Sequence, residues 1–353
     1  MKLITDIDGL PPPVAASATA DERAFIKAIK GRGFLPFAVT PFYASLAGTD
    51  RADPIRRQFF PDPRETIRAP YECADPLGES HHRVAPRLVH QYGDRALLLS
   101  SGSCAGYCRH CFRRVWTGEE RSFIAEDELA LPLAYLASHP GIKEILVSGG
   151  DPLIASDDRL EWLFAALRKA RPGILLRLCT RVPVVDPRRI DDSLAAMLRK
   201  FRPLRVILHL NPPRELPQEV RDALSRLVDS GIPVHTQTVL LRGINDDVQL
   251  LAGLFRELTD LGATPYYLFQ GDLAPGTAHF RVPLARGMEL YAALRRCCSP
   301  LSLPIYAVDL PGGGGKLHLT EASLHGEERD ADGRISHILR RPDGTLWRYP
   351  KED

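Results

Sequence analysis

The chain of 353 residues has no long hydrophobic segment and no strong excess of charge of either sign. No run approaches the ~18 apolar residues of a membrane-spanning helix, and the opening residues, MKLITDIDGLPPP, lack the apolar core of a secretory signal. Lysine and arginine number 46 against 44 acidic residues, and this net charge of +2 gives no sign of a nucleic-acid-binding surface. These absences predict a cytoplasmic protein that binds neither membranes nor nucleic acids.

The chain also has no internal repeat and no low-complexity segment, and its hydrophobic content of 44% is ordinary for a folded protein. Its length suits two domains or one large α/β barrel. Residues 1–90 are rich in proline and short polar clusters, which predicts an irregular, partly helical N-terminal region. We expect a β/α core over 91–300 and a C-terminal segment over 301–353, whose Asp-Gly pairs at 332–333 and 343–344 predict β-hairpin turns.

From residue 95 onward, short apolar runs alternate with windows of helical periodicity. One window places four apolar residues on a single helix face, namely Leu160, Leu163, Phe164 and Leu167. Seven runs are predicted to be buried strands: 96–99, 145–148, 175–179, 206–210, 233–241, 266–269 and 305–308. This alternation predicts an α/β fold with a parallel sheet, and it fits a partial or full β/α barrel better than a doubly wound sheet.

Polar residues lie at or near the ends of these predicted strands. They are, in chain order, Cys104–Cys111, Ser148–Asp151, Thr180 and Arg181, His209 and Asn211, Gln237, Asp272, and Asp309. In β/α barrels the carboxyl ends of the strands carry the chemistry. The pattern therefore predicts one active site at that end of the barrel.

The cysteines are the first distinctive feature. Seven is an odd number, and three of them, Cys104, Cys108 and Cys111, lie within eight residues. Three thiolates on one loop can hold three irons of a 4Fe–4S cube and leave the fourth iron open to another ligand. Zinc bound by these cysteines and His110 is the alternative, but structural zinc more often uses two separated ligand pairs, and no second pair of that kind is evident. The spacing favours the cluster.

This CxxxCxxC loop, following a first strand, resembles the radical S-adenosylmethionine (SAM) superfamily. The resemblance implies a partial (β/α)6-type barrel in which SAM chelates the open iron and is cleaved to a 5′-deoxyadenosyl radical. It also matches Ser148-Gly149-Gly150-Asp151 to the superfamily's glycine-rich strand end, which meets the SAM amino group. Without the cysteines, Gly-Gly-Asp would be read as a common turn.

The sequence PGGGGK at 311–316 is the second distinctive feature. It is not a phosphate-binding Walker loop, because Leu310 and Leu317 occupy the positions that require glycine and serine or threonine. The glycines either form a flexible turn with an incidental lysine or present Lys316 for a Schiff base with pyridoxal 5′-phosphate (PLP). Together with the cysteine loop, the motif closely resembles the lysine 2,3-aminomutase family, which uses a 4Fe–4S cluster, SAM and PLP in one site.

This second resemblance implies roles for individual residues. Lys316 is the catalytic residue and carries PLP, with Tyr92 and Arg95 as further PLP contacts, although Gln91 stands where the family has a basic residue. Arg113 holds the substrate carboxylate. The SAM-binding candidates besides Ser148–Asp151 are His110, Arg181, His209 and Gln237. Asp272 and Asp309 match a pair of aspartates that bind the distal ammonium of the substrate.

The implied reaction is a 1,2-amino migration that converts L-lysine to β-lysine, catalysed by an isomerase. Three alternatives are the same shift on another cationic amino acid such as arginine, the family branch that supplies β-lysine for modifying a translation factor, and a zinc-stabilised β/α protein that binds a phosphorylated ligand without radical chemistry. The expected partners are a small amino acid and an electron donor such as flavodoxin or ferredoxin. The sequence leaves a homo-oligomer open.

Overall fold

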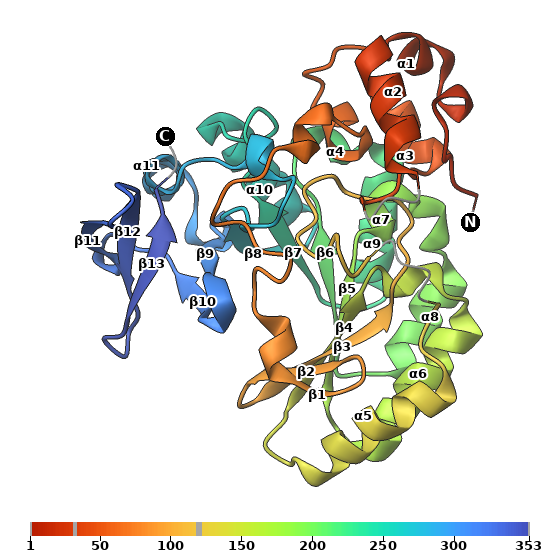
Figure 1. Ribbon diagram of the computed structural model, residues 1–353. Coiled ribbons are helices and arrows are strands. Elements are labelled where there is room, and N and C mark those ends of the chain that lie inside the picture. Colours follow the sequence, from red (N-terminus) through yellow and green to blue (C-terminus); the bar gives the residue numbers. More distant parts are fainter. Residues whose placement is uncertain (1, 31–33, 118–121, 352–353) are drawn as a thin grey trace.

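The computed structural model describes residues 2–30, 34–117 and 122–351, which form two β-sheets (Figure 1). Ten strands follow one another in chain order across the large sheet, and three strands form a separate small sheet. The large sheet contains β1 (Arg83–Ala85), β2 (Leu88–Tyr92), β3 (Arg95–Ser101), β4 (Glu144–Gly149), β5 (Leu175–Thr180), β6 (Leu204–His209), β7 (Val234–Val239), β8 (Thr264–Phe269), β9 (Ile305–Leu310) and β10 (Gly315–His318). The small sheet contains β11 (Leu324–Arg329), β12 (Ile335–Arg340) and β13 (Leu346–Pro350).

Strands β3 to β9 run parallel, whereas β1, β2 and β10 pair antiparallel at the two edges. Each of the seven predicted strands overlaps one of β3 to β9, although the predictions at 206–210 and 233–241 extend beyond β6 and β7. In β4 the side chains of Ile145 and Val147 are 0% exposed, while Leu146 between them lines a central cavity. The strands therefore pack on helices with one face and enclose a cavity with the other, as a partial (β/α)6-type barrel requires.

Helices connect the parallel strands, and Figure 1 shows α5, α6 and α8 along the outer side of the sheet. All four apolar residues predicted on the face of α6 are 0% exposed. Within the described ranges no helix has the length and apolar character of a membrane span. The α-helices are α1 (Pro12–Ala16), α2 (Ala20–Ile29), α3 (Pro41–Ser45), α4 (Arg56–Phe59), α5 (Glu126–Ser138), α6 (Asp157–Ala170), α7 (Val182–Val185), α8 (Asp192–Lys200), α9 (Gln218–Asp229), α10 (Val248–Asp260) and α11 (Leu284–Cys297).

The N-terminal region is irregular and partly helical, as predicted, and it packs onto the barrel (Figure 1). Helix α2 begins with a capping box in which Thr19 and Glu22 satisfy each other's backbone N–H groups. The carbonyl of Gln58 in α4 accepts a hydrogen bond from the backbone N–H of Arg109 in the cysteine loop, with 2.8 Å between N and O. The N-terminal helices thus help to position the loop between β3 and α5.

The two edges of the large sheet approach each other without a backbone ladder between them in the described part of the chain. Lys316 of β10 donates its backbone N–H to the hydroxyl of Tyr92 at 2.9 Å, and the Gln91 side chain donates to the carbonyl of Gly313 at 3.1 Å. The barrel is therefore partial and is bridged by side chains where β2 meets the glycine-rich loop. This contact places the PGGGGK motif beside the segment that the sequence assigned to PLP binding.

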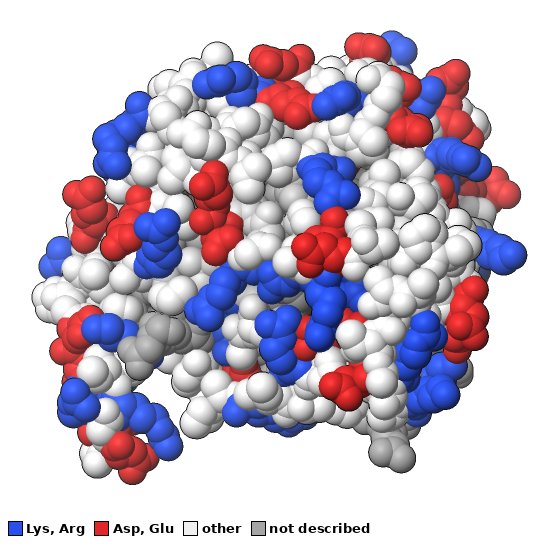
Figure 2. Space-filling model, turned by 90° about the horizontal axis from the view of Figure 1, so that it is seen from above, with Lys and Arg blue, Asp and Glu red and all other residues white. Residues whose placement is uncertain are grey.

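The C-terminal tail forms the small sheet at the left of Figure 1. Both predicted hairpin turns are present, with Gly333 and Gly344 in the left-handed region at φ values of 80° and 85°. Basic and acidic side chains are interspersed over the face of the molecule seen in Figure 2, in keeping with the small net charge. The division at residues 90 and 300 stays a prediction, since β2 spans one boundary and β9 extends the core sheet beyond the other.

Candidate active site

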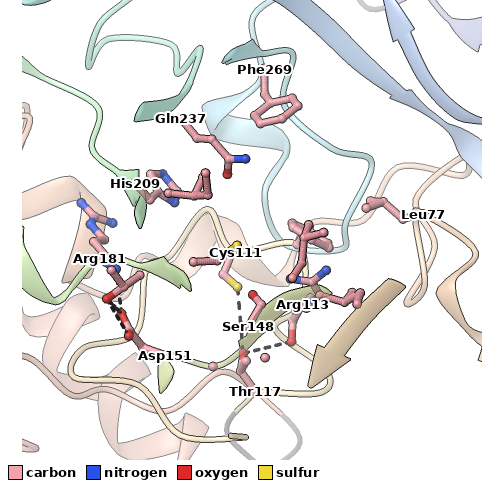
Figure 3. Close-up of a pocket in the computed structure, with 18 of the residues that line it drawn as sticks. Leu77, Cys111, Arg113, Thr117, Ser148, Asp151, Arg181, His209, Gln237 and Phe269 are labelled. Atoms are coloured by element: carbon pink, nitrogen blue, oxygen red, sulfur yellow. Dashed lines mark hydrogen bonds between the residues drawn. The ribbon is translucent and has the colours of Figure 1, made fainter. Parts of the chain in front are cut away.

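A cavity of about 320 Å³ lies inside the curved sheet at the carboxyl ends of the parallel strands (Figure 3). Every residue to which the sequence analysis assigned a binding or catalytic role lines this cavity, whereas Asn211 contacts the cavity residues His110 and His209. They are Tyr92, Arg95, Cys104, Cys108, His110, Cys111, Arg113, Ser148, Gly149, Gly150, Asp151, Arg181, His209, Gln237, Asp272, Asp309 and Lys316. The fold therefore brings the cysteine loop, the glycine-rich strand end and the lysine motif to one place.

The three loop cysteines carry free thiols in half-buried positions. Burial raises the pKa of the Cys104 thiol well above its usual range and also raises that of Cys111. The Sγ of Cys108 accepts a hydrogen bond from Arg181 Nη1, with 2.6 Å between the two atoms. Within the described residues, no three histidine, cysteine or acidic side chains meet closely enough to hold a single metal ion.

Buried ion pairs connect the cysteine loop to the N-terminal region. Glu65, in the 3₁₀ helix η2 (Pro63–Thr66), accepts hydrogen bonds from both Arg109 and Arg114, and its side chain is 0% exposed. Arg109 also donates to the carbonyls of Leu35 and Pro36. Although burial disfavours a charge on Glu65, the two guanidinium groups hold its pKa below the usual range. This carboxylate therefore pairs with two arginines, Arg109 and Arg114, of the cysteine loop.

The glycine-rich strand end requires glycine because the backbones lie so close together. A Cβ on Gly149 would lie 2.3 Å from the carbonyl oxygen of Ser101, and one on Gly150 would lie 2.1 Å from that of Ser103. The carboxylate of Asp151 accepts hydrogen bonds from the Thr180 hydroxyl at 2.7 Å and from the backbone N–H groups of Arg181 and Leu153. Asp151 therefore ties the end of β4 to the end of β5 with groups of the protein itself.

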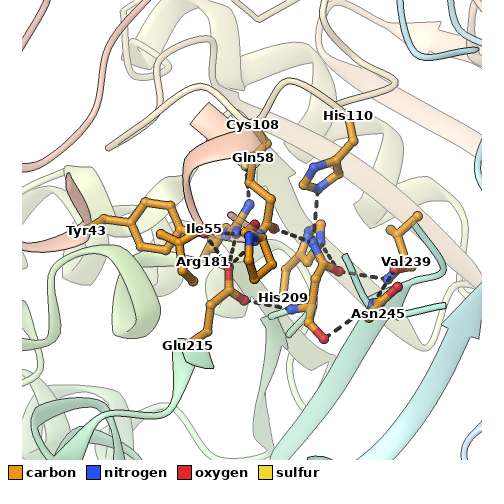
Figure 4. A network of polar contacts seen from close by, with 12 residues as sticks. Tyr43, Ile55, Gln58, Cys108, His110, Arg181, His209, Glu215, Val239 and Asn245 are labelled. Atoms are coloured by element: carbon orange, nitrogen blue, oxygen red, sulfur yellow. Dashed lines mark hydrogen bonds and ion pairs between the residues drawn. The ribbon is translucent and has the colours of Figure 1, made fainter. Parts of the chain in front are cut away.

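A polar network lies behind the cysteine loop and joins several elements (Figure 4). Arg181 pairs with the fully buried Glu215 and also bonds to Tyr43 and Gln58. Asn211 contacts His110 Nε2 and His209 Nε2 at 3.2 Å each. Burial lowers the pKa of His209 to about 3 and lowers that of His110 well below its usual range, so both rings are neutral.

Two atoms of this network are buried and lack a hydrogen-bond partner among the described residues, namely His110 Nδ1 and Arg181 Nε. Unsatisfied buried polar atoms at a cavity wall indicate a polar ligand. The three thiols on the same wall are the donor set of a 4Fe–4S cluster with one open iron. This side of the cavity therefore fits a cluster together with SAM.

Lys316 lies on the opposite side of the cavity, at the end of the glycine-rich loop. Its Nζ is 2.7 Å from Asp309 Oδ2 and 4.0 Å from the ring centroid of Phe269. Asp309 is its direct cross-strand partner in the antiparallel pair of β9 and β10. Arg95 stacks over the ring of Tyr92, with 3.9 Å to the centroid. A reactive amine, a phenol and an arginine so arranged fit an aldehyde cofactor with an anionic group such as PLP.

The remaining charged residues of the cavity are Arg113, Glu79, Asp272 and Arg177, the last of which pairs with Glu144. Glu79, in the 3₁₀ helix η3 (Glu79–His82), accepts hydrogen bonds from Nε and Nη2 of Arg113. The carboxyl group of Asp272 has no hydrogen-bond partner within the described part of the chain. Burial, followed by the nearby charge of Asp309, raises the pKa of Asp272 to about 8.

Several functional residues were missed by the sequence analysis. Glu65, Glu79 and Glu215 each pair with an arginine of the site, yet each comes from a loop or short 3₁₀ segment without periodicity. One signal was available in the sequence, because Arg109, Arg113 and Arg114 crowd the cysteine loop and buried arginines need carboxylates. This crowding predicts that acidic residues pair with the three arginines, but it does not identify those residues.

Comparison with known proteins agrees with this geometry. A family model described as the radical SAM superfamily matches residues 98–254. A putative L-lysine 2,3-aminomutase from Treponema pallidum is 44% identical over 88% of this chain and 89% of its own length. The L-lysine 2,3-aminomutase of Acetoanaerobium sticklandii is 37% identical over 90% of this chain and 76% of its own, and the glutamate 2,3-aminomutase of Clostridioides difficile is 35% identical over 90% and 74%.

Among solved structures, a radical SAM methyltransferase from Sphaerobacter thermophilus aligns with a TM-score of 0.46 and 21% identity, covering 63% of this chain and 68% of its own. The fold, the cysteine loop and the family match define a radical SAM enzyme. Within that superfamily the chain belongs to the lysine 2,3-aminomutase family. It is accordingly an isomerase that works with a 4Fe–4S cluster, SAM and PLP, and the zinc-protein alternative is not favoured.

Proposed function

We propose that this enzyme moves the α-amino group of L-lysine to the β-carbon and so produces β-lysine. The observation that carries the proposal is the half-buried carboxyl group of Asp272, which has no hydrogen-bond partner among the described residues and lies in the cavity that Arg113 also lines. A buried carboxylate without a counter-ion is unfavourable, and a bound cation relieves that cost. An arginine and an unpaired acid in one cavity suit a zwitterion that carries an additional distal cation.

The same charges argue against an acidic substrate. One relative is named a glutamate 2,3-aminomutase, so the family as a whole does not decide the substrate. A second carboxylate placed near these two residues would be repelled by Asp309, and by Asp272 whenever that group is ionised. The substrate names of the relatives from Treponema and Acetoanaerobium support lysine over arginine as the cation.

In this reaction the protein's own side chains hold the cofactors and orient the substrate. Cys104, Cys108 and Cys111 would hold the cluster, and Lys316 would hold PLP. When bound, these groups supply radical chemistry and a ring that delocalises the unpaired electron. Asp309 accepts hydrogen bonds from Nζ of Lys316 and so holds this amine at the cavity.

Arg113 orients the substrate carboxylate, and Asp272 binds its distal ammonium group. Together they fix both ends of the substrate, so that the β-carbon is presented in one orientation. The rings of Tyr267 and Phe269, 4.9 Å apart, line the cavity beside Lys316 and exclude water from it.

The electron for the cluster must come from outside the chain. We propose a flavodoxin or ferredoxin as donor, in the cytoplasm, where all seven cysteines would stay reduced as they are here.

An anaerobic assay tests the proposed reaction. The reconstituted, reduced enzyme is incubated with SAM and a panel of L-amino acids that contains lysine, arginine, ornithine and glutamate. We expect a β-amino isomer from lysine alone, identified by chromatography and mass spectrometry. A β-isomer from glutamate, or none from lysine, would contradict the proposal.

The raised pKa of Asp272 predicts how substrate affinity depends on pH. Burial raises this pKa to about 8, so the group is mainly protonated at pH 7, whereas the ammonium group of lysine binds the ionised form. Affinity for L-lysine should therefore rise from pH 6 to pH 8, by up to about tenfold per pH unit. The dissociation constant, measured at each pH, should lose this dependence in Asp272→Asn. A constant affinity of the wild-type enzyme over this range would refute the assignment.

A further inference from the structure

The ion pair between Glu79 and Arg113 has no place in the proposed chemistry, although both residues line the cavity. Glu79 binds the edge of the guanidinium group formed by Nε and Nη2, with 3.1 Å between Nε and Oε2. The side chain of Arg113 is 16% exposed and that of Glu79 is 15% exposed. Within the described residues Nη1 makes no hydrogen bond, so that corner of Arg113 is available to a ligand.

Glu79 is held rigidly by its surroundings. The carboxylate of Asp75 accepts hydrogen bonds from the backbone N–H groups of Glu79 and Ser80, at 2.9 Å each. The preceding residue, Gly78, lies against the glycine-rich loop, where a Cβ would lie 2.5 Å from the nitrogen of Gly313. These contacts fix the backbone at Glu79, from which its carboxylate reaches Arg113.

Arg113 has a second carboxyl group in its surroundings. Asp272 lines the same cavity, has no hydrogen-bond partner among the described residues, and lies close enough to Arg113 to interact with its charge. An arginine side chain is long and has considerable rotational freedom, so a free guanidinium group turns to the nearest unpaired carboxylate. If Arg113 paired with Asp272, neither would be available to the two ends of an amino-acid substrate.

We propose that Glu79 is a positioning residue that holds Arg113 away from Asp272 and so keeps the cationic and anionic walls of the cavity apart. This inference rests on the proposed function, in which those walls bind the carboxylate and the distal ammonium of the substrate. Glu79 occupies one edge of the guanidinium group and leaves Nη1 to the substrate carboxylate. The residue contributes to substrate specificity without touching the substrate.

The closing experiment measures binding of L-lysine by the change in PLP absorbance of the loaded enzyme in the absence of SAM. In Glu79→Gln the neutral amide cannot accept both hydrogen bonds from Arg113, and we expect the dissociation constant to rise by about tenfold or more. In the Asp272→Asn background Arg113 has no carboxylate at position 272 to pair with. There E79Q should change the dissociation constant of L-lysine by less than about twofold. His81→Ala, an exposed neighbour in η3, should bind L-lysine as the wild type does.

Iron and PLP contents of each variant show that the site is assembled. Unchanged or tighter binding in E79Q, or an equal loss in both backgrounds, would overturn the inference. A wild-type enzyme without any response to L-lysine would instead refute the proposed function. A crystal structure of E79Q tests the inference independently of any substrate, because Arg113 should then contact Asp272, and an Arg113 that remains in place would overturn it.

Discussion

Replacement of Lys316 by alanine should abolish PLP binding and lower turnover by more than about a thousandfold. Lys316 is the amine of the glycine-rich loop that reaches the cavity, and its Nζ is held by Asp309 and the ring of Phe269. Absorbance spectra of the purified variant should lack the PLP band, while the iron content stays that of the wild type. The cluster survives because its cysteines lie on a different loop, across the cavity.

Lys200→Ala is the matched control for this experiment. Lys200 also pairs with an acidic residue, Glu161, at 3.1 Å, but this pair lies on the surface. The control variant should retain both the absorbance band and turnover. A PLP band that persists in K316A at full intensity would show that another group holds the cofactor.

Replacement of Glu65 by glutamine should destabilise the protein by about 3–5 kcal/mol and remove most of its iron. The change keeps the shape of the side chain but leaves the buried guanidinium groups of Arg109 and Arg114 without their carboxylate. Both arginines belong to the segment that presents Cys108 and Cys111, so a rearrangement there displaces the thiols. Thermal unfolding under anaerobic conditions and iron analysis measure the two effects.

Glu161→Gln provides the comparison for a surface pair. The side chain of Glu161 is 42% exposed and that of Lys200 is 62% exposed, so loss of this pair should cost no more than about 1 kcal/mol. Its iron content should equal that of the wild type. If E65Q were as stable and as rich in iron as E161Q, the buried network would not be what holds the cysteine loop.

Much of the barrel was predictable from the sequence because its signals are local. In the run Leu175–Cys179, for example, Leu176 and Leu178 are 0% exposed, whereas Arg177 and Cys179 line the cavity. The helix face of Leu160 and Leu167 follows from the helical period alone. The cysteine spacing and the PGGGGK motif are equally local, since each lies within eight residues.

Pairs of charges were not predictable in the same way. Glu65 and Arg109 are 44 residues apart in sequence, and Glu79 and Arg113 are 34 residues apart. No periodicity marks such pairs, because a single contact of a few ångströms between two loops leaves no repeating pattern. The partners of Asp151 were not predictable either. Its carboxylate accepts hydrogen bonds from the Thr180 hydroxyl and from backbone N–H groups, and no sequence pattern marks these contacts.

The sequence by itself determined the order of strands and helices and the presence of a thiol loop and a reactive lysine in one barrel. These features depend on short-range periodicity and on residues that are neighbours along the chain. Only the tertiary structure decided which charges neutralise one another and which remain unpaired. Arg113 is held by Glu79 because the irregular segment before β1 packs against the glycine-rich loop at the open edge of the sheet, while Asp272 has no hydrogen-bond partner among the residues that the structure describes.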